Sequence, residues 1–301
     1  MPDLSEFVGF VVEKSGVRKP SLVEKDILIH RILKEIVSSQ LGDKYLFKGG
    51  SCLVKCYFGY YRFSVDLDFT WIDQSRWNGL GKKRLRRELL KETENFASLL
   101  ERIAKEAGID FRNDVSDKNY IEIGGGNRMV TFKLWKNSEL VKIQVNFVEK
   151  IIFNHEKRIA RTLIDENKIF EEERIYFDEF LRFYTPVEVL VYSKEEILCE
   201  KVRAILTRRA QKLRDFYDVF MLEKHGVNIE ELRDDIVEKI RAAMYFQKYR
   251  KNIEKNMESL AIEKILDDPL EREMFITRPP VEFDEFMRKF EKVVRRLERR
   301  Y

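Results

Sequence analysis

The spacing of apolar residues changes along the chain, and each spacing predicts a different kind of element. Where apolar residues recur every three to four positions, as at Val23, Ile27 and Ile36, we expect amphipathic helices. Where they alternate with polar residues, as at Val130 and Phe132, we expect strands. The helices predicted before residue 155 are 5–14, 20–39, 53–60 and 76–107, and the strands are 45–48, 66–72, 120–123, 129–135 and 141–147.

After about residue 155 helical patterns predominate. A short β-like stretch at 185–192 is followed by Ser193 and Glu196, which have the spacing of a capping box. Together these patterns predict an α+β fold in which a mixed sheet flanked by helices, residues 1–155, is followed by a mainly helical domain, residues 156–301. The helices predicted in the second half are about 194–209, 213–226, 229–244 and 283–300.

Composition adds limits on the class of protein. Hydrophobic residues make up 44% and charged residues 37% of the 301, so the chain can bury a core and is not a disordered one. A net charge of +4 excludes a global polycation. Cys52, Cys56 and Cys199 have no metal-binding spacing, and with no secretory leader they predict a reducing cytoplasm. No apolar run approaches the ~20 residues that span a bilayer.

A glycine turn opens the segment that carries the chemistry, residues 48–69. Gly49 and Gly50 allow turn geometry and close approach of a bulky ligand. Ser51 follows at a position that predicts a helix cap, and the free N–H groups at such a helix start form an anion site. The alternative is an ordinary turn between a strand and a helix.

Two carboxylates follow on the strand predicted at 66–72. Asp66 and Asp68 are two residues apart, so their side chains share one face of the strand. Adjacent carboxylates repel unless a cation lies between them, and carboxylate oxygens suit Mg²⁺ or Mn²⁺. Two exposed acids on an edge strand are the alternative. A phosphate-binding turn joined by a short helix to a metal-binding Asp-x-Asp strand is what nucleotidyl transfer from an NTP requires.

This pattern resembles the signature of the polymerase-beta-like nucleotidyltransferases, in which Gly-Ser is followed by Asp-x-Asp. The flanking residues narrow the resemblance, over about 22–222, to the AbiEii/AbiGii toxin family. The matching runs are Glu24-Lys25-Asp26, Phe47-Lys48-Gly49-Gly50-Ser51, Arg62-Phe63-Ser64-x-Asp66-x-Asp68-Phe69, Glu200-Lys201-Val202-x-Ala204 and Arg214-Asp215-Phe216-Tyr217-Asp218.

The resemblance implies roles for residues far apart in the sequence. The fold would be of the nucleotidyltransferase type, with the helical domain completing the cleft. Lys201 would neutralise phosphate charge, and Asp215 would assist the metal or the acceptor, with Asp218 as a further candidate. The alternative for Asp218 is an ion pair with Arg214 on the protein surface, which would have no catalytic role. The residues expected to bind the nucleotide are Lys48, Gly49, Gly50, Ser51 and Ser64, with Arg62 as a further candidate.

The chain departs from the polymerase-beta-like pattern at the third carboxylate. Gln144 and Asn146 occupy the expected places, and Glu149 lies slightly beyond them. The general base is therefore not identified, and Gln144 stays a candidate site residue. Ser64 is open to three interpretations: a phosphate contact, a phosphorylation site or a structural hydroxyl.

The resemblance further implies the toxin of a toxin–antitoxin or abortive-infection system, with an antitoxin protein as partner. The reaction would move a nucleoside monophosphate to an acceptor hydroxyl, for which we favour RNA at the 3′ end of tRNA. The alternatives are a protein hydroxyl, or a member that binds nucleotide or RNA without turnover. Three basic clusters, at 76–91, 201–214 and 288–300, are either RNA contacts or solvated helix faces.

Two further sequence features each have a functional and a purely structural interpretation. Lys25 and Asp26 are either functional, as the resemblance implies, or part of a solvated helix face. The run Gly124-Gly125-Gly126-Asn127 is predicted to be a hairpin turn rather than a phosphate loop, because no helix follows it.

Overall fold

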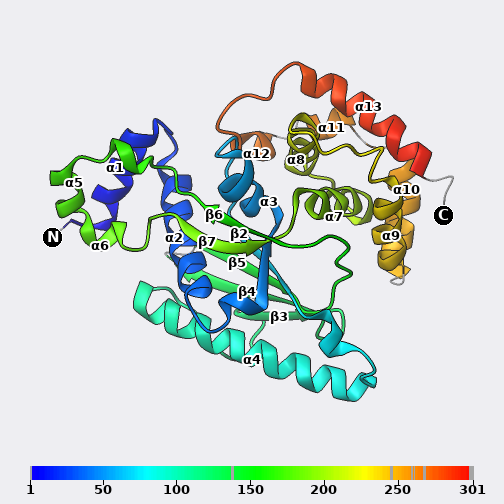
Figure 1. Ribbon diagram of the computed structural model, residues 1–301, viewed down its shortest axis with the longest axis horizontal. Helices are drawn as coiled ribbons and strands as arrows, with labels where there is room; N and C mark the ends of the chain where they lie inside the picture. The colour runs from blue at the N-terminus through cyan, green and yellow to red at the C-terminus, as the bar shows by residue number, and fades with distance from the viewer. Residues whose placement is uncertain are drawn as a thin grey trace. The chain divides into compact units, whose positions relative to one another are not determined.

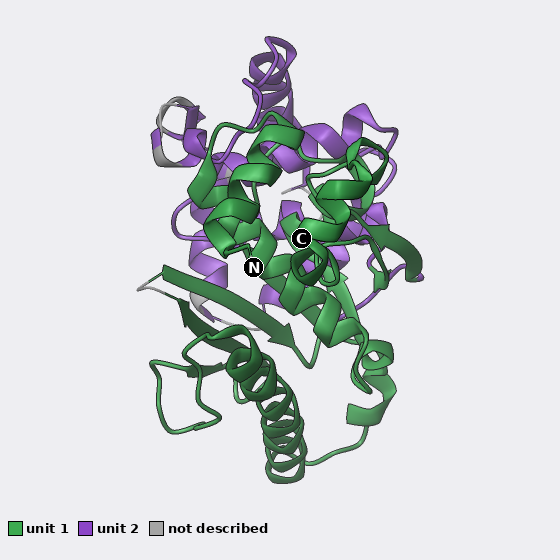
Figure 2. Ribbon diagram, turned by 90° about the vertical axis from the view of Figure 1, so that its left-hand side faces the viewer, with its two compact units in different colours: residues 1–149, 155–191 green, residues 150–154, 192–301 purple. Residues whose placement is uncertain are grey.

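The computed structural model describes residues 2–136, 139–244, 247–258, 260, 262–266 and 269–297. The chain divides into two compact units, which Figure 2 shows in different colours. The first consists of residues 1–149 and 155–191, and the second of residues 150–154 and 192–301. Each unit has its own core, and each is described separately below.

The first unit is built on a mixed seven-stranded sheet with the order β3-β4-β5-β2-β1-β7-β6. The strand that carries Asp66 and Asp68, β2, lies inside this sheet, antiparallel to β1 and parallel to β5. The predicted mixed sheet and α+β class are thus confirmed. The strands are β1 (Tyr45–Lys48), β2 (Asp66–Trp71), β3 (Ile121–Gly124), β4 (Met129–Lys136), β5 (Glu139–Asn146), β6 (Glu156–Ala160) and β7 (Val187–Val191).

One face of the sheet is covered by α4 (Lys82–Ala107), the long helix along the lower edge of Figure 1. Phe96 of this helix packs against Phe69 and Phe132, whose side chains lie on the face opposite Asp66 and Asp68. The helix ends at Gly108 in the left-handed conformation, as predicted. The other helices of this unit are α1 (Leu4–Ser15), α2 (Pro20–Val37), α3 (Gly49–Cys52), α5 (Glu171–Tyr176) and α6 (Asp178–Leu181), with single turns at Gly42–Lys44, Gln74–Trp77 and Glu166–Lys168 and a π-helical turn at Leu53–Phe58.

The sheet receives two strands from residues that the sequence pattern assigned to the helical half. In β7, Val191 lies beside Phe47 of β1, and β6 pairs antiparallel with β7 at the edge of the sheet. The pattern of β6 carried no signal because Ala160 is its one buried residue. The hairpin between β3 and β4 was predicted, and Gly125, Gly126 and Asn127 all have positive φ there.

Among the described residues of the second unit, helices joined by loops are the only regular elements. Its core includes edge-to-face aromatic pairs between α8 and α13, such as Phe216 with Phe290 and Phe220 with Phe283. The last residues of the helix predicted at 283–300 lie outside the described residues. Within the described ranges, none of the helices combines the length and the apolar composition that a membrane span requires. The helices are α7 (Lys194–Thr207), α8 (Leu213–Lys224), α9 (Arg233–Met244), α10 (Gln247–Glu258), α11 (Ile262–Leu266), α12 (Pro269–Glu273) and α13 (Glu282–Leu297).

Candidate active site

The glycine turn joins β1 to α3, and the chain's own side chains explain its two glycines. Gly49 has φ +76°, and a Cβ at this position would overlap Oδ2 of Asp68. A Cβ on Gly50 would overlap the guanidinium of Arg62 and lie 3.1 Å from Oγ of Ser64. The glycines therefore let the turn approach one of the two carboxylates and a buried cation at van der Waals range.

The predicted cap at Ser51 is wrong. The helix begins two residues earlier, at Gly49, and the flanking residue Lys48 makes no side-chain cap. Ser51 is buried, and its hydroxyl donates to the backbone carbonyl of Asp66. This bond holds the turn against Asp66, the first residue of β2. Ser51 therefore helps to fix the position of Asp66 relative to the turn. The short helix predicted at 53–60 is α3 continued by the π-helical turn.

Arg62, a further candidate from the sequence, is 1% exposed and donates to the carbonyl of Phe63 through Nη1 at 2.7 Å. Its position beside Gly50 puts a permanent positive charge under the turn. Ser64 lies against the same glycine and is half-buried. The structure thus brings together Gly50, Arg62 and Ser64, which belong to two separate matching runs of the sequence.

Asp66 and Asp68 share one face of β2 and are both half-buried. They line a groove of about 450 Å³ on that face. The register places Lys48 of β1 and Gln144 of β5 on either side of Asp68. The other residues lining the groove are Glu122, Met129, Thr131, Lys133, Trp135, Leu140 and Lys142.

The two carboxylates fit a Mg²⁺ ion of the kind that substrate phosphates help to hold. No group of three or more His, Cys, Asp or Glu side chains with metal-binding geometry occurs among the described residues. Mg²⁺ is commonly bound by one or two carboxylates together with phosphate oxygens, so two are sufficient for such an ion. Two carboxylates on one face, with the glycine turn beside Asp68, fit a metal ion that is shared with substrate phosphates. They do not fit a metal ion that is held by protein side chains alone.

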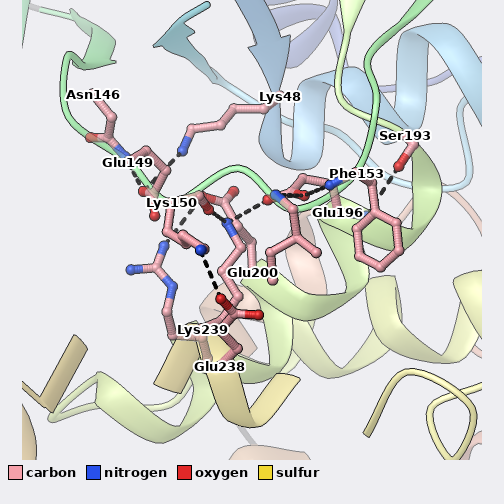
Figure 3. Close-up of polar contacts among 12 residues, drawn as sticks. Lys48, Asn146, Glu149, Lys150, Phe153, Ser193, Glu196, Glu200, Glu238 and Lys239 are labelled. Atoms are coloured by element: carbon pink, nitrogen blue, oxygen red, sulfur yellow. Dashed lines mark hydrogen bonds and ion pairs between the residues drawn. The ribbon is translucent and has the colours of Figure 1, made fainter. Parts of the chain in front are cut away.

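The third carboxylate of the polymerase-beta-like pattern is absent beside Asp68, where β5 presents Gln144. Glu149, the nearest acid further along, instead contacts Lys48, with Nζ 3.9 Å from Oε2, and accepts from Nδ2 of Asn146 at 3.2 Å (Figure 3). Both side chains of the Lys48–Glu149 pair are largely buried. Glu149 therefore orients Lys48, a residue expected to bind the nucleotide.

In the second unit, the residues expected to act on the nucleotide form an ion cluster. Nζ of Lys201 on α7 lies 2.8 Å from Oδ1 of Asp215 and 2.6 Å from Oδ2 of Asp218, both on α8. The two carboxylates are buried, and Arg208 also contacts Asp215. That this cluster acts on the same nucleotide as Asp66 stays a prediction. For the alternative, a surface pair of Arg214 with Asp218, the structure shows Arg214 in contact with Glu271 at 3.5 Å and Asp218 buried against Lys201.

The start of α7 differs from the predicted capping box. Ser193 does cap the helix by accepting from the backbone N–H of Glu196 at 3.2 Å. The carboxylate of Glu196, however, accepts from the backbone N–H groups of Ile152 and Phe153, at 2.9 and 2.8 Å, and pairs with the buried Lys239 (Figure 3). Nothing in the sequence indicated this partner, because Lys239 lies more than forty residues away on α9.

A second buried network was also missed. Asp26 is 3% exposed and accepts from Nζ of Lys55 at 2.7 Å and from the hydroxyl of Tyr184 at 2.8 Å. The interpretation of Asp26 as part of a solvated face is therefore wrong. The available signal was Lys55 itself, a lysine within the apolar run 52–56, because a buried ammonium requires an anion. The network anchors the π-helical turn that follows the glycine turn.

The glycine turn, the two carboxylates on an adjacent strand and the groove across them are arranged as a nucleotidyltransferase site would require. The sequence profile of the family described as "Nucleotidyl transferase AbiEii toxin, Type IV TA system" matches residues 31–297. The chain belongs to this family, as the sequence motifs predicted, and it is a nucleotidyltransferase toxin of a type IV toxin–antitoxin system. An NTP substrate and a cognate antitoxin follow from this membership.

A solved structure agrees on the fold. MenT4, a nucleotidyltransferase toxin from Mycobacterium tuberculosis H37Rv, superposes with a TM-score of 0.54 at 17% identity, over 96% of this chain and 87% of that one. An antigenic nucleotidyltransferase-like protein from Paracoccidioides brasiliensis gives a TM-score of only 0.28 at 14% identity, over 64% and 74% of the two chains. No curated protein matches the sequence.

Proposed function

We propose that this toxin transfers a nucleoside monophosphate from an NTP to a hydroxyl of RNA, with the 3′ end of tRNA as the favoured acceptor. The observation that supports this most strongly is the pair Asp66 and Asp68, accessible in a groove beside the Gly49 turn. In the reaction, the acceptor oxygen forms a bond to the α-phosphorus. The bond from that phosphorus to the bridging oxygen breaks, and pyrophosphate leaves.

Residues of the first unit would bind and orient the triphosphate. The backbone N–H groups after Gly49 and the ammonium of Lys48 are donors for its outer oxygens. The charge of Arg62 under the turn adds to the field that favours the anion. Asp66 and Asp68 would hold Mg²⁺ or Mn²⁺, which when bound supplies charge neutralisation at the reacting phosphate.

Residues of the second unit would act on the charge that develops as pyrophosphate departs. Lys201 is the cation for this role, and Asp215 and Asp218 hold its ammonium in a fixed place. A cation that is held by two carboxylates before substrate binds needs little reorganisation during the reaction. The resemblance implies that Asp215 assists the metal or the acceptor, and Asp215 is a candidate for taking the acceptor proton, since Gln144 cannot accept it in place of a carboxylate.

One experiment separates this proposal from its two alternatives. The protein is incubated with each NTP labelled at the α-phosphate, with Mg²⁺ or Mn²⁺, total RNA and lysate protein. Label on RNA supports the proposal. Label on protein supports nucleotidylation of a protein hydroxyl. Nucleotide binding without transferred label supports a non-catalytic member, the alternative that Gln144 beside Asp68 favours. The antitoxin would suppress the labelling or its effect in the cytoplasm.

A further inference from the structure

The active-site groove continues away from the carboxylates across β5 and β4. The register pairs Asp66 with Lys142 and Lys142 with Lys133, and directly paired residues share one face of a sheet. Two pairs further along the same two strands, and so on the same face, Leu140 stands opposite Trp135. The open face therefore presents, in order from Asp66, two lysines and then an indole ring, all of them lining the groove.

The groups in this row are accessible but not equally so. Lys142 is exposed. Lys133 is partly neutralised, because its Nζ lies 2.8 Å from Oε2 of Glu122. Those two lysines also hold the pKa of the Glu122 carboxyl below its usual value, first through the hydrogen bond from Lys133. Trp135 is half-buried, and its Nε1 donates to the carbonyl of Asn119 at 3.0 Å, which fixes the plane of the ring.

The two lysines and Trp135 lie on the side of β2 from which the acceptor hydroxyl would have to approach. The glycine turn follows β1, on one side of β2, and β5 lies on the other side. In phosphoryl and nucleotidyl transfer the attacking and leaving oxygens are roughly in line across the phosphorus. If pyrophosphate leaves from the Gly49 turn, the acceptor hydroxyl must approach from the side of β5.

We propose that Lys133, Lys142 and Trp135 form the binding site for the single-stranded 3′ segment of the RNA acceptor, which we call the acceptor groove. Backbone phosphates contact Lys142 and Lys133, and a base stacks on Trp135. This inference rests on the proposed transfer to RNA. Lysines beside a fixed indole suit a strand with phosphates and bases, whereas a protein hydroxyl would use neither.

Substitutions at Glu122 and at Lys142 should change RNA affinity in opposite directions. Its carboxylate is 60% exposed at the rim of the groove and pairs with Lys133, so it competes with RNA phosphates for that ammonium. Glu122→Gln removes the competition and the repulsion, and it should tighten RNA binding. A variant at Lys142 should weaken it. A general loss of folding cannot produce both effects.

The test measures binding and turnover separately. Binding of a fluorescent single-stranded oligoribonucleotide is followed by anisotropy without NTP, and labelling of the same RNA gives the KM values for RNA and NTP. For Lys142→Ala we expect an RNA Kd raised roughly three- to tenfold and a salt dependence smaller by about 0.7 log units per log unit of salt, the loss of one phosphate contact. The KM for NTP should not change.

Trp135→Leu should raise the RNA Kd by roughly tenfold or more, whereas Trp135→Phe, which keeps an aromatic face, should retain most of the affinity. Lys105→Ala is the matched control, because Lys105 is an exposed lysine on α4, the helix that covers the opposite face of the sheet. It removes the same charge and should leave both the RNA Kd and the labelling unchanged.

Several results would contradict the proposal that the acceptor groove binds RNA. They are an RNA Kd of Lys142→Ala equal to the wild type, an equal loss in Lys105→Ala, weaker binding by Glu122→Gln, or a raised KM for NTP with RNA affinity intact. Failure of the proposed function looks different, because the wild-type protein would then label no RNA at all.

Discussion

Gln144 of β5 lies directly beside Asp68 of β2, in register on the neighbouring parallel strand. Its side chain shares the face of the two carboxylates, and its amide nitrogen donates to Sδ of Met129 at 2.7 Å. An amide at this position can bind a metal through its oxygen but cannot take a proton from the acceptor. The proposed site therefore rests on two carboxylates.

Replacing Gln144 by Glu should convert the site to three carboxylates. We expect the Mg²⁺ concentration for half-maximal transfer to fall several-fold, because a charged oxygen ligand is added beside Asp68. Without metal, the melting temperature should drop slightly through like-charge repulsion. The measurement is a Mg²⁺ titration of initial rates. Asn146→Asp is the comparison: Asn146 pairs with Thr70, two positions further along the strands, so an acid there lies farther from Asp68 and should lower the Mg²⁺ requirement less. Equal Mg²⁺ requirements in Gln144→Glu and wild type would contradict this geometry.

Gly49→Ala should abolish transfer. The new Cβ would overlap Oδ2 of Asp68, and a φ of +76° strains any residue with a side chain. Gly59 is a matched control because it has the same φ of +76°, but a Cβ added there would meet no other atom within 4 Å. Both alanine variants should lose about 1–3 kcal/mol of stability, measured by denaturant unfolding. Transfer activity retained in Gly49→Ala would show that the turn does not have to approach Asp68 closely.

Lys201→Ala should weaken NTP binding and turnover together, because the cation acts on ground state and transition state alike. It should also destabilise the second unit by roughly 3 kcal/mol, since the buried Asp218 loses its ammonium partner. Lys201→Arg separates the two roles. It keeps the charge and the stability, while the planar guanidinium presents a different geometry to phosphate and should still lower turnover. Wild-type kinetics in Lys201→Arg would limit Lys201 to a structural role.

His30 predicts how stability depends on pH. Burial, followed by the nearby charge of Lys55, lowers the pKa of His30 from 6.5 to about 3. Between these two values the unfolded chain binds a proton that the folded chain does not. The free energy of unfolding should therefore fall with decreasing pH below 6.5, by up to about 1.4 kcal/mol per pH unit.

The measurement is the melting temperature from pH 7.5 to pH 5 for wild type and His30→Gln. The variant keeps a donor toward the carbonyl of Thr185, which Nε2 of His30 contacts at 2.7 Å, but does not titrate, so its curve should be flatter. His155→Gln, at an exposed histidine, should follow the wild type. Parallel curves for His30→Gln and wild type would show that His30 is not the group responsible.

Local signals in the sequence were sufficient for much of the fold. The alternating strands β4 and β5, the long helix ending at Gly108 and the turn before β4 all depend on periodicity or on glycine conformation, which neighbouring residues determine. The segment from Gly49 to Asp68 was found for the same reason. Its parts are close in sequence, so spacing alone predicted that the turn and the carboxylates meet.

Features that depend on distant partners were not predictable in this way. Nothing near Asp26 in the sequence indicates that Lys55 and Tyr184 will surround it, and nothing near Glu196 indicates Lys239. The edge strand β6 carries almost no apolar pattern, because most of its side chains face solvent. The position of the Ser51 hydroxyl followed from a bond to β2 rather than from its preference for a helix start.

The most direct test of the central claim, that Asp66 and Asp68 form the catalytic centre for nucleotidyl transfer, is a single labelling measurement. Wild-type protein and Asp66→Asn are incubated with α-labelled NTP, Mg²⁺ and total RNA, and the transferred label is counted, with the melting temperature of both recorded. We predict label on RNA with the wild type and none with Asp66→Asn, at a melting temperature that is unchanged or raised because a like-charge repulsion is removed. Transfer by Asp66→Asn at most of the wild-type rate would contradict the assignment.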